Sequence, residues 1–170
     1  GVSWHEAVAY CNWLEHQVGF PTRLPTESEW ERAARDQDER IYPWGNEFDG
    51  TLANFCDDRC TFPQKDRSWD DGYASTAPVG SYEGGASPYG ALDMAGNVWE
   101  WVADGFDEDY YSRSPDQNPT GPEDARYLVR RGGGFNSFGR DLRASRRASG
   151  SAHHFFDGQM GFRCAMDDSP

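Results

Sequence analysis

The chain has 170 residues, a length that suits one domain with a sizeable core. Its formal net charge of −13 argues against nucleic acid as a partner, and no apolar run is long enough for membrane insertion or resembles a signal peptide. Aromatic residues make up 15% of the chain beside 19 glycines and 10 prolines, which favours short elements joined by many ordered loops.

Two helices are predicted near the start of the chain. The first begins with a Ser-x-x-Glu capping box at Ser3, and the apolar residues after it recur at helical spacing until Gly19. The second follows Pro25, where Thr26 opens a Thr-x-x-Glu capping box and Trp30 begins a buried stripe.

Irregular but ordered structure is expected over most of the remaining chain. Residues 42–88 are rich in glycine, proline and aspartate, but their aromatic residues are too frequent for a solvated linker. Residues 104–124 are polar and contain three prolines, which predicts a surface loop. Strands are predicted at 127–130 and 161–165.

A basic patch interrupts this acidic chain, with four arginines among residues 140–147. Arg143, Arg146 and Arg147 either pair internally with the surplus acids or project into a binding groove. Arg163 lies in the final predicted strand, where a structural ion pair is expected to act mainly through its geometry.

The four cysteines predict disulfides, although the sequence alone allows three pairings. A bridge between Cys11 and Cys164 would tie the two ends of the chain together. Cys56 and Cys60 enclose two acids and are compatible with a small disulfide or with half of a metal site. Disulfides favour an extracytoplasmic location, whether secreted, periplasmic or at the cell surface.

The stretch 89–101 carries a physical conflict in its sequence. Trp99 and Trp101 flank Glu100; the rings are costly to expose, and an unpaired carboxylate between them is costly to bury. A bound cation or a dense hydrogen-bond cage would resolve this conflict.

Several sequence blocks, in this order, resemble the formylglycine-generating enzyme (sulfatase-modifying factor) family. They are residues 2–13, 23–34, 42–46, 53–54, 76–79, 89–101, 131–134 and 161–165. The resemblance implies a single α+β domain over 1–170, with a C-type-lectin-like fold, low regular secondary structure and many ordered loops. The family's usual segment ahead of residues 2–13 is absent, which is compatible with a piece of a larger polypeptide.

The resemblance also implies one or two structural calcium ions. One ligand set comprises Asn54, the Phe55 carbonyl, Asp71 and the Tyr73 carbonyl. The other comprises Asp93, the carbonyls of Gly96 and Val98, and Glu100. Such mixed carboxylate, amide and carbonyl oxygens suit calcium. The alternative is that Asp93 and Glu100 only cap loops through hydrogen bonds to backbone N–H groups.

The same resemblance pairs Cys11 with Cys164 and leaves Cys56 with Cys60. The enzymes of this family oxidise a substrate cysteine with two cysteines that bind copper(I), soon after the Gly-Gly block. Residues 135–147 contain no cysteine; Ser137 and Leu142 stand near the expected positions. Because copper(I) needs soft thiolate ligands, neither copper nor the usual oxidase chemistry is expected.

The leading interpretation is a non-oxidase binding module that recognises a protein, peptide or glycan through a variable face at about 135–160. The residues expected to bind this ligand are Phe135, Asn136, Ser137, Phe138, Arg140, Asp141, His153, His154, Phe155 and Phe156. Two alternatives stay open. One is an oxidoreductase-type enzyme or accessory domain of the same family, in sulfatase maturation or thiol and sulfur oxidation. The other is a purely structural domain.

Overall fold

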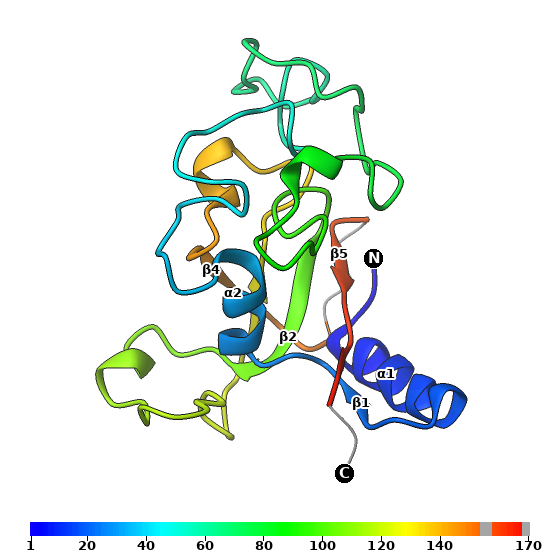
Figure 1. The fold of residues 1–170 in the computed structure, drawn as a ribbon, viewed down its shortest axis with the longest axis vertical. Coiled ribbons are helices and arrows are strands. Elements are labelled where there is room, and N and C mark those ends of the chain that lie inside the picture. The colour runs from blue at the N-terminus through cyan, green and yellow to red at the C-terminus, as the bar shows by residue number, and fades with distance from the viewer. Residues whose placement is uncertain (154–157, 168–170) are drawn as a thin grey trace.

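The computed structural model describes residues 1–153 and 158–167, which form an α+β architecture with short elements (Figure 1). The helices are α1 (Trp4–Val18) and α2 (Glu27–Arg35), and the 3-10 turns are Glu83–Gly85, Tyr110–Ser112 and Gly139–Leu142. The strands are β1 (Thr22–Arg23), β2 (Trp99–Gly105), β3 (Leu128–Arg131), β4 (Arg147–Gly150), β5 (Met160–Phe162) and β6 (Ala165–Met166).

Both predicted helices are confirmed, and each begins at its predicted capping box. The side chain of Ser3 accepts a hydrogen bond from the backbone N–H of Glu6, and Thr26 does the same for Glu29. The first helix ends at Gly19, which adopts a left-handed φ of 77° that glycine accommodates without a Cβ clash.

A four-stranded sheet in the order β4-β3-β2-β5 crosses the middle of the molecule. β3 pairs antiparallel with both β2 and β4, whereas β5 pairs parallel with β2. The register places Glu100 between Arg131 of β3 and Gly161 of β5. The stretch 89–101, with the conflict at Glu100, therefore runs into β2, one of the two central strands of this sheet.

A two-stranded sheet joins segments near the two ends of the chain. β1 pairs antiparallel with β6, and Cys11 of α1 is disulfide-bonded to Cys164, just before β6. The single strand predicted at 161–165 is wrong in its extent, because β5 and β6 pair with different partners and are separated by Arg163 and Cys164.

Three clusters of buried apolar residues form the core. One lies between α1 and the sheet, and a second lies between α2 and the sheet. The third lies among the loops and contains Tyr42, Ala53, Phe55, Ala95 and Leu142. The loops between α2 and β2 gather at one end of the molecule in Figure 1 and bury aromatic side chains there. This packing confirms the expectation of ordered loops.

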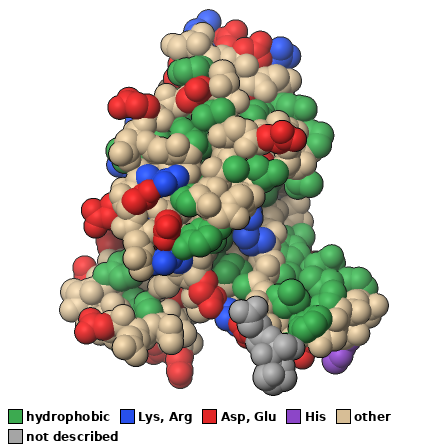
Figure 2. All heavy atoms as spheres, in the orientation of Figure 1, with side chains coloured by type: hydrophobic (Ala, Val, Ile, Leu, Met, Phe, Trp, Pro, Cys, Tyr) green, Lys and Arg blue, Asp and Glu red, His purple; other side chains and the backbone are tan. Residues whose placement is uncertain are grey.

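Acidic side chains are spread over the visible face of the molecule (Figure 2). An exposed aromatic pair on α1, Tyr10 and Trp13, lies with ring centroids 5.4 Å apart. Within the described part of the chain, neither helix combines the length and apolar character needed to cross a bilayer.

Candidate ligand-binding pocket and calcium sites

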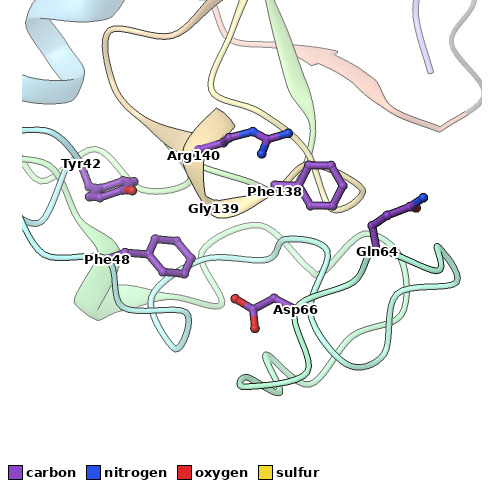
Figure 3. A pocket seen from close by; sticks show the side chains of 7 residues that line it. All are labelled: Tyr42, Phe48, Gln64, Asp66, Phe138, Gly139 and Arg140. Atoms are coloured by element: carbon purple, nitrogen blue, oxygen red, sulfur yellow. The ribbon is translucent and has the colours of Figure 1, made fainter.

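A pocket of about 630 Å³ opens between the loops of residues 42–66 and the segment 138–140, which follows the glycines at 132–134 (Figure 3). Its lining comes from three separate parts of the chain: Tyr42, Phe48, Gln64, Asp66, Phe138, Gly139 and Arg140. Its volume lies in the range of small-molecule and side-chain binding sites.

The aromatic side of the pocket is held by ring packing behind it. Tyr42 stacks on Trp44 with ring centroids 5.2 Å apart, and Phe48 packs edge-on against Phe55 at 5.1 Å. A Cβ at Gly139 would lie only 2.7 Å from the Phe48 ring, so glycine is needed for this close approach. The apolar wall is therefore rigid before any ligand arrives.

Charged groups of opposite sign lie on facing sides of the pocket (Figure 3). The Arg140 guanidinium lies 5.1 Å from the centroid of the Phe138 ring and makes no ion pair with any described residue. Asp66 accepts a hydrogen bond from the Ser68 backbone at 3.0 Å through one oxygen. Arginine over an aromatic ring is a common element of recognition surfaces.

The predicted ligand residues are only partly brought together at this pocket. Phe138 and Arg140 line it, and Phe135 and Asn136 are half-buried nearby in sequence but outside its lining. Ser137 is buried, and its hydroxyl accepts a hydrogen bond from the Gly134 backbone at 3.0 Å.

Two other predicted ligand residues have partners away from the pocket. The Asp141 carboxylate pairs with Arg146 at 3.4 Å. The ring of His153 lies 4.9 Å from that of His5 on α1, and His153 is not in the pocket lining. His154, Phe155 and Phe156 lie outside the described residues. Of the ligand residues predicted within 135–160, only Phe138 and Arg140 therefore line this pocket.

Sequence reasoning missed five pocket residues, of which Gly139 lies between the predicted Phe138 and Arg140. Tyr42 belongs to a Tyr-Pro-Trp-Gly block that signalled the family but not a ligand site, and Phe48 follows it closely. Gln64 and Asp66 lie in a polar loop without any motif. Only tertiary packing brings these segments to one pocket.

The arginine patch is mostly engaged internally. Arg147 forms a paired contact with Glu27 at 2.8 Å, Arg146 contacts Asp141, and Arg143 donates to the Arg140 carbonyl at 2.8 Å. These contacts favour the structural alternative for these three residues, while Arg140 alone of the patch lines the pocket.

The first predicted calcium set is gathered around Asp71. Its carboxylate oxygens accept the backbone N–H groups of Phe55 and Tyr73, each at 2.8 Å. Burial raises the pKa of Asp71 to about 6. Asn54 donates to the Ser75 carbonyl at 2.7 Å, but its own buried Oδ1 has no hydrogen-bond partner among the described residues. A buried oxygen of this kind is usually satisfied by an ordered water or an ion.

In the second predicted calcium set, the carboxylate of Glu100 is already paired with a cation, Arg163. Both oxygens of Glu100 accept hydrogen bonds from Arg163, at 2.6 and 2.7 Å, and one also accepts the Trp30 indole N–H at 2.7 Å. Arg163 further donates to the Asp93 carbonyl at 3.3 Å. The conflict at Glu100 is therefore resolved by a hydrogen-bond cage that contains a guanidinium cation.

The second set also has a cavity and a backbone turn that could admit an ion. Asp93, Val98 and Glu100 line a cavity of about 440 Å³ together with Arg163. Gly96 has a φ of 82°, and a Cβ there would lie 2.3 Å from the Asn54 carbonyl oxygen. Among the described residues, no three His, Cys, Asp or Glu side chains converge as a metal cluster. Any calcium site here must draw on amide and carbonyl oxygens.

All four cysteines are in disulfides, Cys11 with Cys164 and Cys56 with Cys60. Both predicted pairings are confirmed, and the half-metal-site alternative for Cys56 and Cys60 is wrong in this oxidised structure. Two disulfides are compatible with an extracytoplasmic location.

Comparison with known proteins agrees with this architecture. Residues 1–168 match the family described as the sulfatase-modifying factor enzyme 1-like domain. A formylglycine-generating enzyme of Thermomonospora curvata is 40% identical over 98% of this chain and 54% of its own length. A bovine relative named inactive C-alpha-formylglycine-generating enzyme 2 is 34% identical over 96% of this chain and 48% of its own length.

A solved structure shows the same fold. PvdO from Pseudomonas aeruginosa superposes with a TM-score of 0.78 at 27% identity, covering 98% of this chain and 60% of that one. The chain spans about half the length of the curated relatives it matches. On the family match and these identities, the chain belongs to the sulfatase-modifying factor (formylglycine-generating enzyme-like) family, with that family's α+β fold.

Proposed function

We propose that this chain is a ligand-binding module of the family without copper oxidase activity. The observation that carries the proposal is the pocket directly after Ser137, in a segment that holds no cysteine. Packed aromatic rings, an arginine without an ion-pair partner among the described residues, and an acid surround this pocket. That composition suits a peptide or protein side chain with both apolar and polar parts.

The positions expected for a copper-binding pair have other roles in this chain. Ser137 is buried and hydrogen-bonded to Gly134, and Leu142 is fully buried in the loop core. The cysteines that are present form disulfides, so in this state none offers a thiolate to copper(I). A bovine relative is itself named as inactive, which supports the same interpretation.

The pocket is tested by selection of a phage-displayed random peptide library and by a glycan array. We expect enrichment of ligands on the wild-type protein and loss of their binding in F138A/R140A, because these side chains supply an apolar contact and the cation that lines the pocket. The matched control is Y10A/W13A, which removes exposed aromatic side chains from α1 and should retain binding.

The outcome also separates binding from oxidation. Copper-dependent oxygen consumption with a cysteine-containing peptide would contradict the proposal and favour the oxidoreductase alternative. A well-folded protein that selects neither peptide nor glycan would instead favour a purely structural domain.

We further propose that calcium stabilises the loop end of the molecule, with its best-supported site at Asn54 and Asp71. The unpartnered Asn54 Oδ1 and the carboxylate of Asp71 are suitable hard oxygen donors, and the Phe55 and Tyr73 carbonyls would complete the predicted set. At the second set, Arg163 already supplies a positive charge to Glu100, so calcium there has weaker support. When bound, the ion would neutralise the buried acid and crosslink the loops.

Calcium removal should lower the melting temperature of the protein, because an ion that binds only the folded state stabilises it by mass action. The measurement is thermal unfolding with calcium and after chelation, beside metal analysis by mass spectrometry. N54A should abolish most of the calcium-dependent shift, whereas N136A, a matched amide deletion near the pocket, should retain it. An equal shift in both variants would place calcium elsewhere.

An extracytoplasmic location follows as part of the same proposal, because both disulfides must persist for the structure described. Recovery of oxidised protein from a secreted or periplasmic fraction would support it.

A further inference from the structure

We infer that the Cys56–Cys60 disulfide is a redox-sensitive latch that holds the two sides of the ligand pocket together. The inference rests on the proposed function, since it concerns the same pocket. It assigns a role to the two cysteines that the calcium and ligand sites do not use.

Cys56 is hydrogen-bonded to both sides of the pocket through its backbone. Its N–H donates to the Ser137 carbonyl at 2.8 Å, immediately before the pocket residue Phe138. Its carbonyl accepts the N–H of Asp66, a residue of the opposite side, at 2.9 Å. One residue therefore fixes the distance between two segments that are far apart in the sequence.

The loop at 57–66 has little other regular structure to hold it. It contains no helix or strand. Its internal backbone hydrogen bonds are a few turn contacts, such as the one from the Cys60 N–H to the Asp57 carbonyl at 3.1 Å. Phe62 within this loop is exposed rather than packed in the core. The disulfide joins Cys56, just before this loop, to Cys60 within it and so encloses residues 57–59. Loops with few buried contacts open most readily.

A dithiol reductant, either a small molecule or a redox protein, supplies the chemistry. Its thiolate attacks Sγ of Cys60, which is 6% exposed whereas Cys56 is fully buried, and the bond to the Cys56 sulfur breaks. The second reductant thiol then displaces Cys60. Two protein thiols and one reductant disulfide result, with two electrons transferred and the Cys56 and Cys60 thiolates protonated by solvent.

Opening the disulfide frees the Cys56 backbone, so both of its hydrogen bonds across the pocket become transient. The fold itself should persist, because neither the Cys11–Cys164 bridge nor any helix or strand includes residues 56–66. The latch thus couples the redox state of the surroundings to the shape of the pocket rather than to global unfolding.

Amide hydrogen exchange by NMR, without any ligand, tests the latch independently of whether the pocket binds anything. We expect the amides at positions 56 and 66 to exchange roughly tenfold faster or more in C56S/C60S, the order of change expected on releasing a short disulfide-closed loop. The amides of Trp30 and Ala103, which bond to Thr26 and Pro25, should lose less protection than those at positions 56 and 66.

The control variant is F62S, a serine substitution in the same loop that leaves the disulfide intact. If C56S/C60S does not fold, the same amides are followed in wild-type protein under dithiol reduction, with alkylation and mass analysis to identify the opened bond. Unchanged protection at positions 56 and 66 after the bond is removed would overturn the inference. So would equal acceleration in F62S, because the loop and not the disulfide would then control the pocket.

Discussion

At the scale of single residues, the buried Arg131 shows how this fold uses charge inside its core. Its side chain is fully buried, pairs with Glu27 and Glu31, and donates to the Ala144 carbonyl at 2.8 Å. The guanidinium also lies 5.2 Å from the Trp30 ring centroid. It joins β3, α2 and the loop before β4 through geometry that no other side chain can reproduce.

R131M should lower the free energy of unfolding by about 3–5 kcal/mol, because it removes the positive charge that pairs with the carboxylates of Glu27 and Glu31. R23A is the control: Arg23 pairs with Glu29 and Asp167 at the surface, with its side chain 40% exposed. An exposed pair of this kind contributes about 0–1 kcal/mol. Urea unfolding of both variants measures the difference, and similar losses would contradict the role given to Arg131.

At the scale of elements, α2 docks on the end of β2 through a buried acid. Asp104 accepts the N–H of Glu27, the first residue of α2, at 2.6 Å. Although the helix N-terminus favours a negative charge, burial dominates and raises the pKa of Asp104 to about 6, with the Glu27 charge adding to the increase.

This raised pKa predicts a pH-dependent contribution to stability. Well below pH 3.8 Asp104 is protonated in both the folded and the unfolded chain. As pH rises from 3.8 to about 6, the unfolded chain ionises first, so the free energy of unfolding falls, and above about pH 6 this loss is complete. Relative to D104N, wild type should therefore lose roughly 3 kcal/mol between about pH 3 and pH 7.5.

Urea unfolding of wild type and D104N across this pH range provides the measurement. D49N serves as the control, because hydrogen bonds from Thr51 lower the pKa of the half-buried Asp49, so the stabilisation that its carboxylate contributes is lost only at more acidic pH. If the free energies of unfolding of wild type and D104N differ by the same amount at every pH, burial does not raise the pKa of Asp104.

At the scale of the whole molecule, Cys11–Cys164 connects α1 to the end of the chain across 153 positions. Cys11 also belongs to the core cluster between α1 and the sheet. The bridge closes nearly the entire polypeptide, so it restricts the unfolded chain far more than the four-residue separation of Cys56 and Cys60 does.

C11A/C164A should lower the free energy of unfolding by up to roughly 5 kcal/mol, and C56A/C60A by roughly 2 kcal/mol, from the loop-length dependence of chain entropy. Equilibrium urea unfolding under oxidising conditions compares the two. Equal losses, or a larger loss for the short bridge, would show that local packing outweighs chain entropy in this fold.

Local sequence signals predicted those parts of the molecule that depend on neighbours in the chain. Ser3 and Thr26 capped the two helices where expected, because a capping box satisfies backbone donors within four residues. The disulfide pairing of Cys11 with Cys164 came from the family resemblance. The strand β2 was not predicted, because residues 99–105 are buried on most positions and lack an alternating pattern.

The sequence by itself determined the helix starts and the absence of a cysteine at 135–147, and its resemblance to the family implied the fold class and the pairing of Cys11 with Cys164. Only the tertiary structure decided that Tyr42, Phe48 and Asp66 meet Phe138 and Arg140 in one pocket, and that Arg163 pairs with Glu100. The physical reason is the distance along the chain over which each interaction acts. Helix caps and hydrophobic periodicity involve neighbouring residues, whereas the pocket and the buried ion pair involve residues that only tertiary packing brings together.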